Sequence, residues 1–96
     1  MKIRYTRRAR GDLENIFTYI ASDNTDAARR MRRAIHRTIE LVDTHPYMGI
    51  KNARAPELRS RLVSRYPYRV HYAMRGGEIW IVHIRHTARQ PWTGER

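Results

Sequence analysis

Residues 68–85 read YRVHYAMRGGEIWIVHIR, and this stretch predicts a β-hairpin. Apolar and polar side chains alternate over Tyr68–Met74 and again over Glu78–Arg85, and a period of two is typical of strands. Arg75-Gly76-Gly77 separates the two runs, and its glycines suit the backbone angles of a short hairpin loop. The last third of the chain therefore contributes two antiparallel strands joined by a tight turn.

The length of that loop decides which side chains share a face of the hairpin. A three-residue loop places Met74 opposite Glu78, and one face then carries Tyr68, Val70, Tyr72, Met74, Trp80, Val82 and Ile84. A two-residue Gly-Gly loop instead puts Ile79 and Ile81 with the first of these strands, because a shift of one residue moves every side chain to the other face. The three-residue loop separates apolar from charged residues better, so we expect that register.

Apolar residues recur at helical spacing through the first half of the chain. Lys2–Tyr5 alternates as a short strand would, and Thr6 is suited to cap a helix with one face formed by Ala9, Leu13, Ile16, Phe17 and Ile20. A turn at Ser22–Thr25 precedes a second helix, capped by Asn24 or Thr25, with one face formed by Ala27, Ala28, Met31, Ala34, Ile35, Thr38, Ile39 and Val42. Two helices joined by so short a turn form an antiparallel hairpin.

Helix-breaking residues separate this helical hairpin from the later strands. Pro46 and Gly49 end the second helix, residues 50–57 are expected to form a loop, and a period of two begins again over Leu58–Arg65. The order is one strand, two helices and then three strands in an antiparallel meander. This order predicts an α+β fold in which one sheet of about four strands is covered by the helices.

The chain is short, strongly basic and free of cysteine. Its 96 residues carry 20 Lys and Arg against nine Asp and Glu, a net charge of +11, and 18 of the 20 are Arg. We expect a single domain over residues 1–96 with a thin core and a loose tail from about residue 90 to 96. An acidic protein or a nucleic acid would relieve the self-repulsion of so high a charge.

The sequence contains no cysteine and no long apolar run, and both facts limit the chemistry and the cellular compartment that we expect. Without cysteine the chain can form neither disulfides nor thiolate metal sites, and its five His, with few carboxylates near them, form no metal-binding pattern. No apolar run is long enough for a signal peptide or a membrane span, so we expect a cytoplasmic protein.

Four stretches in one order resemble the RelE/ParE toxin superfamily, and its ParE branch in particular. Residues 9–16 (ARGDLENI) resemble the first helix of that family, and residues 45–49 (HPYMG) resemble the Pro-x-x-Gly break after its second helix. Residues 68–72 (YRVHY) are similar to its central strand. Residues 81–89 (IVHIRHTAR) are similar to the closing strand and to the His-x-x-Arg that follows it in ParE-like members.

This resemblance implies the toxin of a type II toxin–antitoxin pair, wrapped by an acidic antitoxin. It also implies one of two activities. ParE-like members poison DNA gyrase and have no established hydrolytic site, whereas RelE-like members cut mRNA on the ribosome. We expect a growth-inhibiting toxin of the first kind, without cofactor or metal, and the ribosome-dependent mRNA endonuclease is the alternative.

The endonuclease hypothesis can be tested on the residues themselves. Cleavage of RNA without a metal needs a proton acceptor, a proton donor and cations for the phosphate. The candidates for proton transfer are Glu57, His71, His83, His86 and Tyr72, and the cations for the phosphate include Arg61 and Arg69. Superfamily nucleases that use a Glu, an Arg and a terminal His-Tyr pair are similar at Arg69 and, slightly offset, at Glu57. Their His-Tyr pair falls on Thr87-Ala88, which carries neither group, and this departure weakens the hypothesis.

Basic side chains late in the chain are the expected binding residues. The end of the last strand holds donors that are both positioned and exposed, so we expect the target to bind Arg85, His86 and Arg89. We expect the antitoxin to bind Arg59, Arg61, Arg65 and Arg69. His71 and His83 are interpreted as surface strand residues. No helix-turn-helix or ribbon signature is present, so sequence-specific DNA binding is not expected.

Overall fold

Two helices and one five-stranded sheet make up the computed structural model, which describes residues 1–89 and 92–94. The elements are β1 (Lys2–Tyr5), α1 (Arg7–Ala21), α2 (Thr25–Thr44), β2 (Ile50–Lys51), β3 (Leu58–Leu62), β4 (Tyr68–Arg75) and β5 (Glu78–His86). The strand order in the sheet is β1-β5-β4-β3-β2, with β1 parallel to β5 and the other neighbours antiparallel. The predicted α+β fold is confirmed.

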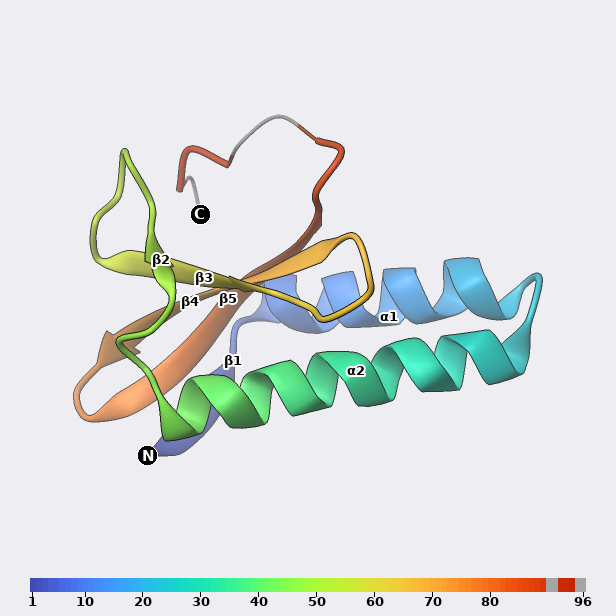
Figure 1. Ribbon diagram of the computed structural model, residues 1–96, viewed down its shortest axis with the longest axis horizontal. Helices are drawn as coiled ribbons and strands as arrows, with labels where there is room; N and C mark the ends of the chain where they lie inside the picture. The colour runs from blue at the N-terminus through green and yellow to red at the C-terminus, as the bar shows by residue number, and fades with distance from the viewer. Residues whose placement is uncertain (90–91, 95–96) are drawn as a thin grey trace.

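The helices lie side by side over one face of the sheet, and the C-terminal segment returns over the other face (Figure 1). We call this second face the open face. The main core lies between helices and sheet and includes Met31, Ile35, Ile39, Val42, Val70, Tyr72, Ile79, Ile81 and Ile84. A smaller apolar cluster on the open face consists of Leu58, Ala73, Val82 and Trp92. Both faces of the sheet are therefore packed in part.

Side chains cap both helices at their N-termini. Thr6 Oγ1 accepts a hydrogen bond from the N–H of Ala9 at 3.1 Å, and Asn24 Oδ1 accepts one from the N–H of Ala27 at 3.0 Å. Such a cap is worth about 1 kcal/mol to a helix. Both predicted helix starts are confirmed, and of the two candidates at the second helix Asn24 is the cap.

The strands on one side of the sheet differ from the prediction. Residues 50–57 were expected to be all loop, but Ile50 and Lys51 form β2, which pairs with Ser60 and Arg59. Two residues are too few to show a period of two. The predicted strand Leu58–Arg65 ends early, at Leu62, and Arg65 has a φ of 70°, a left-handed angle that a strand does not accommodate.

The β4–β5 hairpin does not have the expected register. Arg75 pairs with Glu78 and Met74 with Ile79, so the loop is the two residues Gly76 and Gly77. Their φ angles are 55° and 76°, and two positive φ angles are what the tightest hairpin turn requires. The prediction of a three-residue loop was wrong because it was argued from side-chain segregation, while the turn itself favours the Gly-Gly pair.

A β-bulge then changes the register partway along the hairpin. Tyr72 pairs with Ile81 but His71 pairs with His83, so β5 has one extra residue, Val82. Before the bulge Ile81 faces the helices, and after it Ile84 does. The two-residue loop gives the correct register before the bulge, whereas after it the three-residue loop predicts the correct face for Ile84 but the wrong pairing, because Val70 pairs with Ile84 and not with Val82. A bulge leaves no signal in an alternating pattern read from one strand alone.

A buried tyrosine hydroxyl fixes the chain between α2 and β2. Tyr72 Oη donates to the carbonyl of Pro46 at 2.7 Å and accepts from the N–H of Gly49 at 3.1 Å. A Cβ on Gly49 would lie 2.9 Å from the Tyr72 ring carbon Cζ, so only glycine allows this approach. The segment Pro46–Gly49, predicted from the sequence to end the second helix, is thus hydrogen-bonded directly to β4.

Replacing Tyr72 by Phe is expected to destabilise the fold by about 1–3 kcal/mol, because the buried N–H of Gly49 loses its acceptor. The free energy of unfolding from urea titration measures the effect. Tyr19→Phe is the control, since Tyr19 is exposed on α1. Equal stability of the two variants would contradict this role for the Tyr72 hydroxyl.

Candidate functional site

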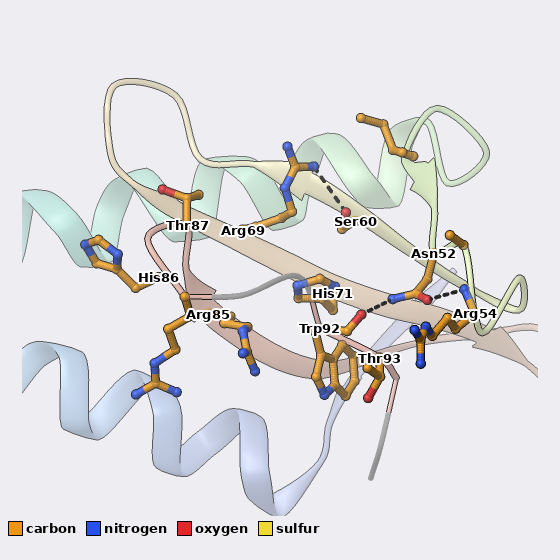
Figure 2. Close-up of a pocket in the computed structure, with 13 residues that line it drawn as sticks. Asn52, Arg54, Ser60, Arg69, His71, Arg85, His86, Thr87, Trp92 and Thr93 are labelled. Atoms are coloured by element: carbon orange, nitrogen blue, oxygen red, sulfur yellow. Dashed lines mark hydrogen bonds between the residues drawn. The ribbon is translucent and has the colours of Figure 1, made fainter.

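A cavity of about 560 Å³ opens on the open face of the sheet (Figure 2). It is lined by Ile50, Asn52, Ala53, Arg54, Ser60, Arg69, His71, Arg85, His86, Thr87, Arg89, Trp92 and Thr93. Among these described residues four are Arg and none is Asp or Glu. We call it the basic cavity, because its charged lining residues are all cationic apart from its two histidines.

One wall of the basic cavity is formed by neighbouring strands. Arg69 on β4 donates from Nη1 to Ser60 Oγ on β3 at 3.1 Å (Figure 2). The hydrogen bond restricts a side chain that is otherwise long and flexible, so one guanidinium is held in place before any partner binds.

Trp92 forms the apolar part of the cavity. It is only 8% exposed, and the centroid of its ring lies 4.9 Å from those of both His71 and His83, edge-on to each. Asn52 Nδ2 donates to the Trp92 carbonyl at 2.8 Å, while Asn52 Oδ1 accepts from the N–H groups of Arg54 and Ala55. Asn52 therefore joins the loop after β2 to the C-terminal segment.

His71 lies beside Trp92 and is 6% exposed. Its ring stacks on that of His83 with 6.0 Å between centroids. Within the part of the chain that the structure describes, His71 Nδ1 has no hydrogen-bond partner. Buried polar atoms are normally paired, so this buried nitrogen is an exception among the described residues.

The imidazole of His71 is neutral at pH 7. Burial is the main cause that lowers the pKa of His71 from 6.5 to about 4, and the cause next in size is the neighbouring His83. The positive charges of Arg69, Arg85 and Arg8 lower the pKa further, because they disfavour a second cation nearby.

A carboxylate from α1 holds the far end of β5. Strand β1 pairs with β5 only as far as Ile81, and beyond it Asp12 Oδ2 accepts from the backbone N–H of Ile84 at 2.9 Å. The same oxygen accepts from His83 Nδ1 at 2.6 Å, so Nδ1 carries the proton there. The strand is thereby fixed immediately before Arg85 and His86, which reach the basic cavity.

The comparisons with known proteins agree with this architecture. Residues 3–91 match the family model described as ParE toxin of type II toxin-antitoxin system, parDE. The chain belongs to the ParE toxin family. A solved structure described as the chromosomal ParDE TA system from P. aeruginosa has a similar fold, with a TM-score of 0.77 and 23% sequence identity. That match covers 90% of this chain and 95% of the other. No curated protein matches the sequence.

The ParE-family toxin brings the residues expected to bind its target into one place. Arg85, His86 and Arg89 all line the basic cavity, and Arg69, expected to bind the antitoxin, lines it too. His86 Nδ1 accepts from the N–H of Ala88 at 2.9 Å, so Nε2 holds the proton when the ring is neutral. Whether these side chains bind a target remains a prediction.

The other residues expected to bind the antitoxin lie elsewhere. Arg59 and Arg61 pair with Tyr72 and Val70 and so share the helix side of the sheet. Arg59 Nη1 donates to the carbonyls of Tyr47 and Gly49 at 2.9 and 3.1 Å, so part of its hydrogen bonding is internal. Arg65 lines a separate groove with Arg30, Arg33 and Arg37 of α2. The expected antitoxin set is thus spread over three regions.

Only some of the residues considered for RNA cleavage are brought together. Arg69, His71 and His86 line the basic cavity, but Glu57, Arg61, Tyr72 and His83 do not. The interpretation of His83 as a surface residue was wrong, because it is 2% exposed and hydrogen-bonded to Asp12. His71 was expected on the surface as well, and it too is buried, because Trp92 covers it.

Two residues that shape the site were not identified from the sequence. Asp12 was given no role of its own from the sequence, although its spacing from Ala9 and Ile16 places it on the buried face of α1. Trp92 was assigned to the loose tail, yet it is buried against the sheet; residues 90, 91, 95 and 96 of that tail lie outside the described residues. A tryptophan in a polar tail gives no periodic signal.

Neither a metal-binding cluster nor a membrane-spanning helix is found in the part of the chain that the structure describes. Over residues 1–89 and 92–94, no three His, Asp or Glu side chains lie close enough to hold a metal ion. Neither helix combines the length and the apolar character needed to cross a membrane.

Asp12→Asn is expected to lower the free energy of unfolding by about 1.5–3 kcal/mol, because one carboxylate oxygen serves both His83 and Ile84. Glu14→Gln on the exposed side of the same helix is the matched control and should leave stability unchanged. Chemical denaturation of the two variants gives the answer, and a neutral effect of Asp12→Asn would remove this support for β5.

Acid is expected to destabilise the fold through His71. Between pH 6.5 and about 4 the unfolded chain binds a proton on His71 that the folded chain does not, so stability falls as the pH falls through this range. The contribution has a limiting slope of about 1.4 kcal/mol per pH unit. Urea titrations at pH 7 and pH 5 should show a smaller loss for His71→Asn than for the parent protein. His36→Asn, at an exposed position, should lose as much as the parent.

Proposed function

We propose that this ParE-family toxin acts in the cytoplasm by inhibiting DNA gyrase through protein–protein contact, and that a cognate acidic antitoxin neutralises it. Membership of the ParE family supports the toxin role. The observation that carries the mode of action is the basic cavity, which gathers four Arg side chains without a carboxylate among its described residues. Such a surface suits an acidic partner, and Glu57 and His83, two of the groups considered for proton transfer, do not line it.

The contact with gyrase is proposed at the end of β5. Arg85 and His86 stand on a strand that Asp12 holds by its backbone, and Arg89 follows on the exposed turn beyond it. Positioned donors lose less conformational entropy on binding than donors on free side chains. These three residues therefore contribute more to the contact than the exposed Arg residues of α2.

The antitoxin is proposed to bind through an apolar stripe with flanking acids. Large apolar side chains remain exposed between the last turn of α2 and the end of β3, namely Leu41, Tyr47, Met48, Ile50 and Leu62. Surface ion pairs contribute only about 0–1 kcal/mol each, so covering these side chains supplies the affinity. Asp and Glu on the antitoxin then match the net charge of +11.

The alternative, a ribosome-dependent mRNA endonuclease, is supported by one observation. Arg69 and His86, a cation and a titratable group, line the same cavity. Glu57 lies outside that lining and His83 and Tyr72 are buried, so of the other candidates for proton transfer His71 alone lines the same cavity, and it is 6% exposed. Gyrase inhibition is therefore the function that the site supports better.

Toxicity on expression of the chain alone is expected to fall with Arg85→Ala, His86→Ala or Arg89→Ala. Losing one charge-assisted contact at an interface costs about 1.5–3 kcal/mol, or roughly a tenfold to hundredfold loss of affinity. Arg30→Ala and Arg33→Ala on α2 are the matched controls, and cells should remain as sensitive to them as to the parent. Equal toxicity of both groups of variants would contradict the target surface.

Two assays on the purified toxin separate gyrase inhibition from mRNA cleavage. Supercoiling by gyrase should be inhibited, and inhibition should survive Glu57→Gln and weaken by no more than about a hundredfold with His86→Gln, because an interface shares its binding energy over several residues. General acid–base catalysis contributes about 10²–10⁴-fold, so a nuclease would lose its activity with one of these changes. Ribosomal mRNA cleavage that either change abolishes, with supercoiling unimpaired, would replace the proposal by the alternative.

A further inference from the structure

We propose that the basic cavity is a binding site for a phosphate group. The proposal goes beyond gyrase inhibition, since it rests on the cavity and holds whichever protein is the target. Its residues overlap the proposed gyrase contact at Arg85, His86 and Arg89, so a phosphate in the cavity would share that surface.

The charged groups of the basic cavity are all cationic. Arg54 comes from the loop after β2, Arg69 from β4, Arg85 from β5 and Arg89 from the turn after β5. Each guanidinium offers up to five N–H donors in a planar fork that matches two phosphate oxygens. Arg side chains from four parts of the fold thus line one cavity, and none of its described lining residues is Asp or Glu.

The wall of the cavity also contains an unmet buried group. His71 is more than nine-tenths buried, and its Nδ1 has no hydrogen-bond partner among the described residues. Nδ1 itself has almost no exposed surface, so a ligand oxygen would reach it only if the side chains that cover it shifted. Ser60, which already accepts from Arg69 at 3.1 Å, adds a hydroxyl to the same wall.

The arrangement favours phosphate over a carboxylate or a nucleobase. A phosphate monoester carries up to two charges and three terminal oxygens, so it can meet several guanidinium groups at once, whereas a carboxylate has one charge and two oxygens. The rings of Trp92 and His71 are edge-on to each other and almost fully covered, so neither offers an open face on which a base could stack. The site therefore recognises the phosphate group itself, and in a nucleic acid it would bind the backbone without a preference for base sequence.

Titration of the full-length protein with inorganic phosphate at constant ionic strength tests the site, with ¹H–¹⁵N NMR of the Arg and His side chains as the readout. Arg69→Gln and Arg54→Gln should each weaken binding by about tenfold. Arg33→Gln on α2 removes the same charge away from the cavity and should change binding by less than about twofold. A bound anion should also raise the pKa of His71 above its value of about 4.

A ten-residue oligothymidylate distinguishes a free phosphate from a nucleic-acid backbone as the source. Binding of inorganic phosphate with the stated variant pattern supports a site for free phosphate, and binding of the oligonucleotide alone with that pattern supports a backbone site. Equal weakening by Arg33→Gln and Arg69→Gln for both probes would show diffuse attraction to a basic protein and overturn the proposal. So would the absence of binding. Neither result depends on the supercoiling assay, so this site and gyrase inhibition can fail separately.

Discussion

The carboxylate of Asp12 holds helix α1 against the part of β5 that extends beyond β1. Backbone groups at a buried strand edge need partners, and here β1 supplies them up to Ile81, Thr6 bonds to the carbonyls of Ile81 and Val82, and Asp12 takes the N–H of Ile84. The first turns of α1 thereby take the place of a neighbouring strand beside this part of β5. The position of Arg85 and of the residues after it depends on these contacts.

The bulge in β5 and the cluster around Trp92 belong to the same arrangement. The extra residue at Val82 brings both Val82 and His83 into contact with the group of residues around Trp92, while Ile84 returns to the helix-side core. His83 is then close enough to α1 to donate to Asp12, and its ring packs edge-on against that of Trp92. The basic cavity is the space left between this cluster and the end of β5.

Periodic features of the fold could be predicted from the sequence, and single-residue features could not. The apolar positions of α1 and α2 and their caps at Thr6 and Asn24 follow from spacing, because many residues repeat the same signal. The bulge at Val82, the contact of Asp12 with His83 and the burial of Trp92 each depend on one residue meeting a distant part of the chain. For the site, the closeness of Arg85, His86 and Arg89 could be predicted because they are near one another in the sequence. That Arg54 and Arg69 line the same cavity could not be predicted, because it depends on how the strands pair in the sheet.

The pairing of β1 with β5 has a consequence for synthesis on the ribosome. Lys2–Tyr5 (β1) pairs with Glu78–Ile81 of β5, so β1 cannot pair in the sheet until β5 has been synthesised. Contacts this far apart along the chain form late in folding. A nascent chain therefore exposes the apolar face of its helical hairpin until β5 has been synthesised, and the sheet can form fully only after that point.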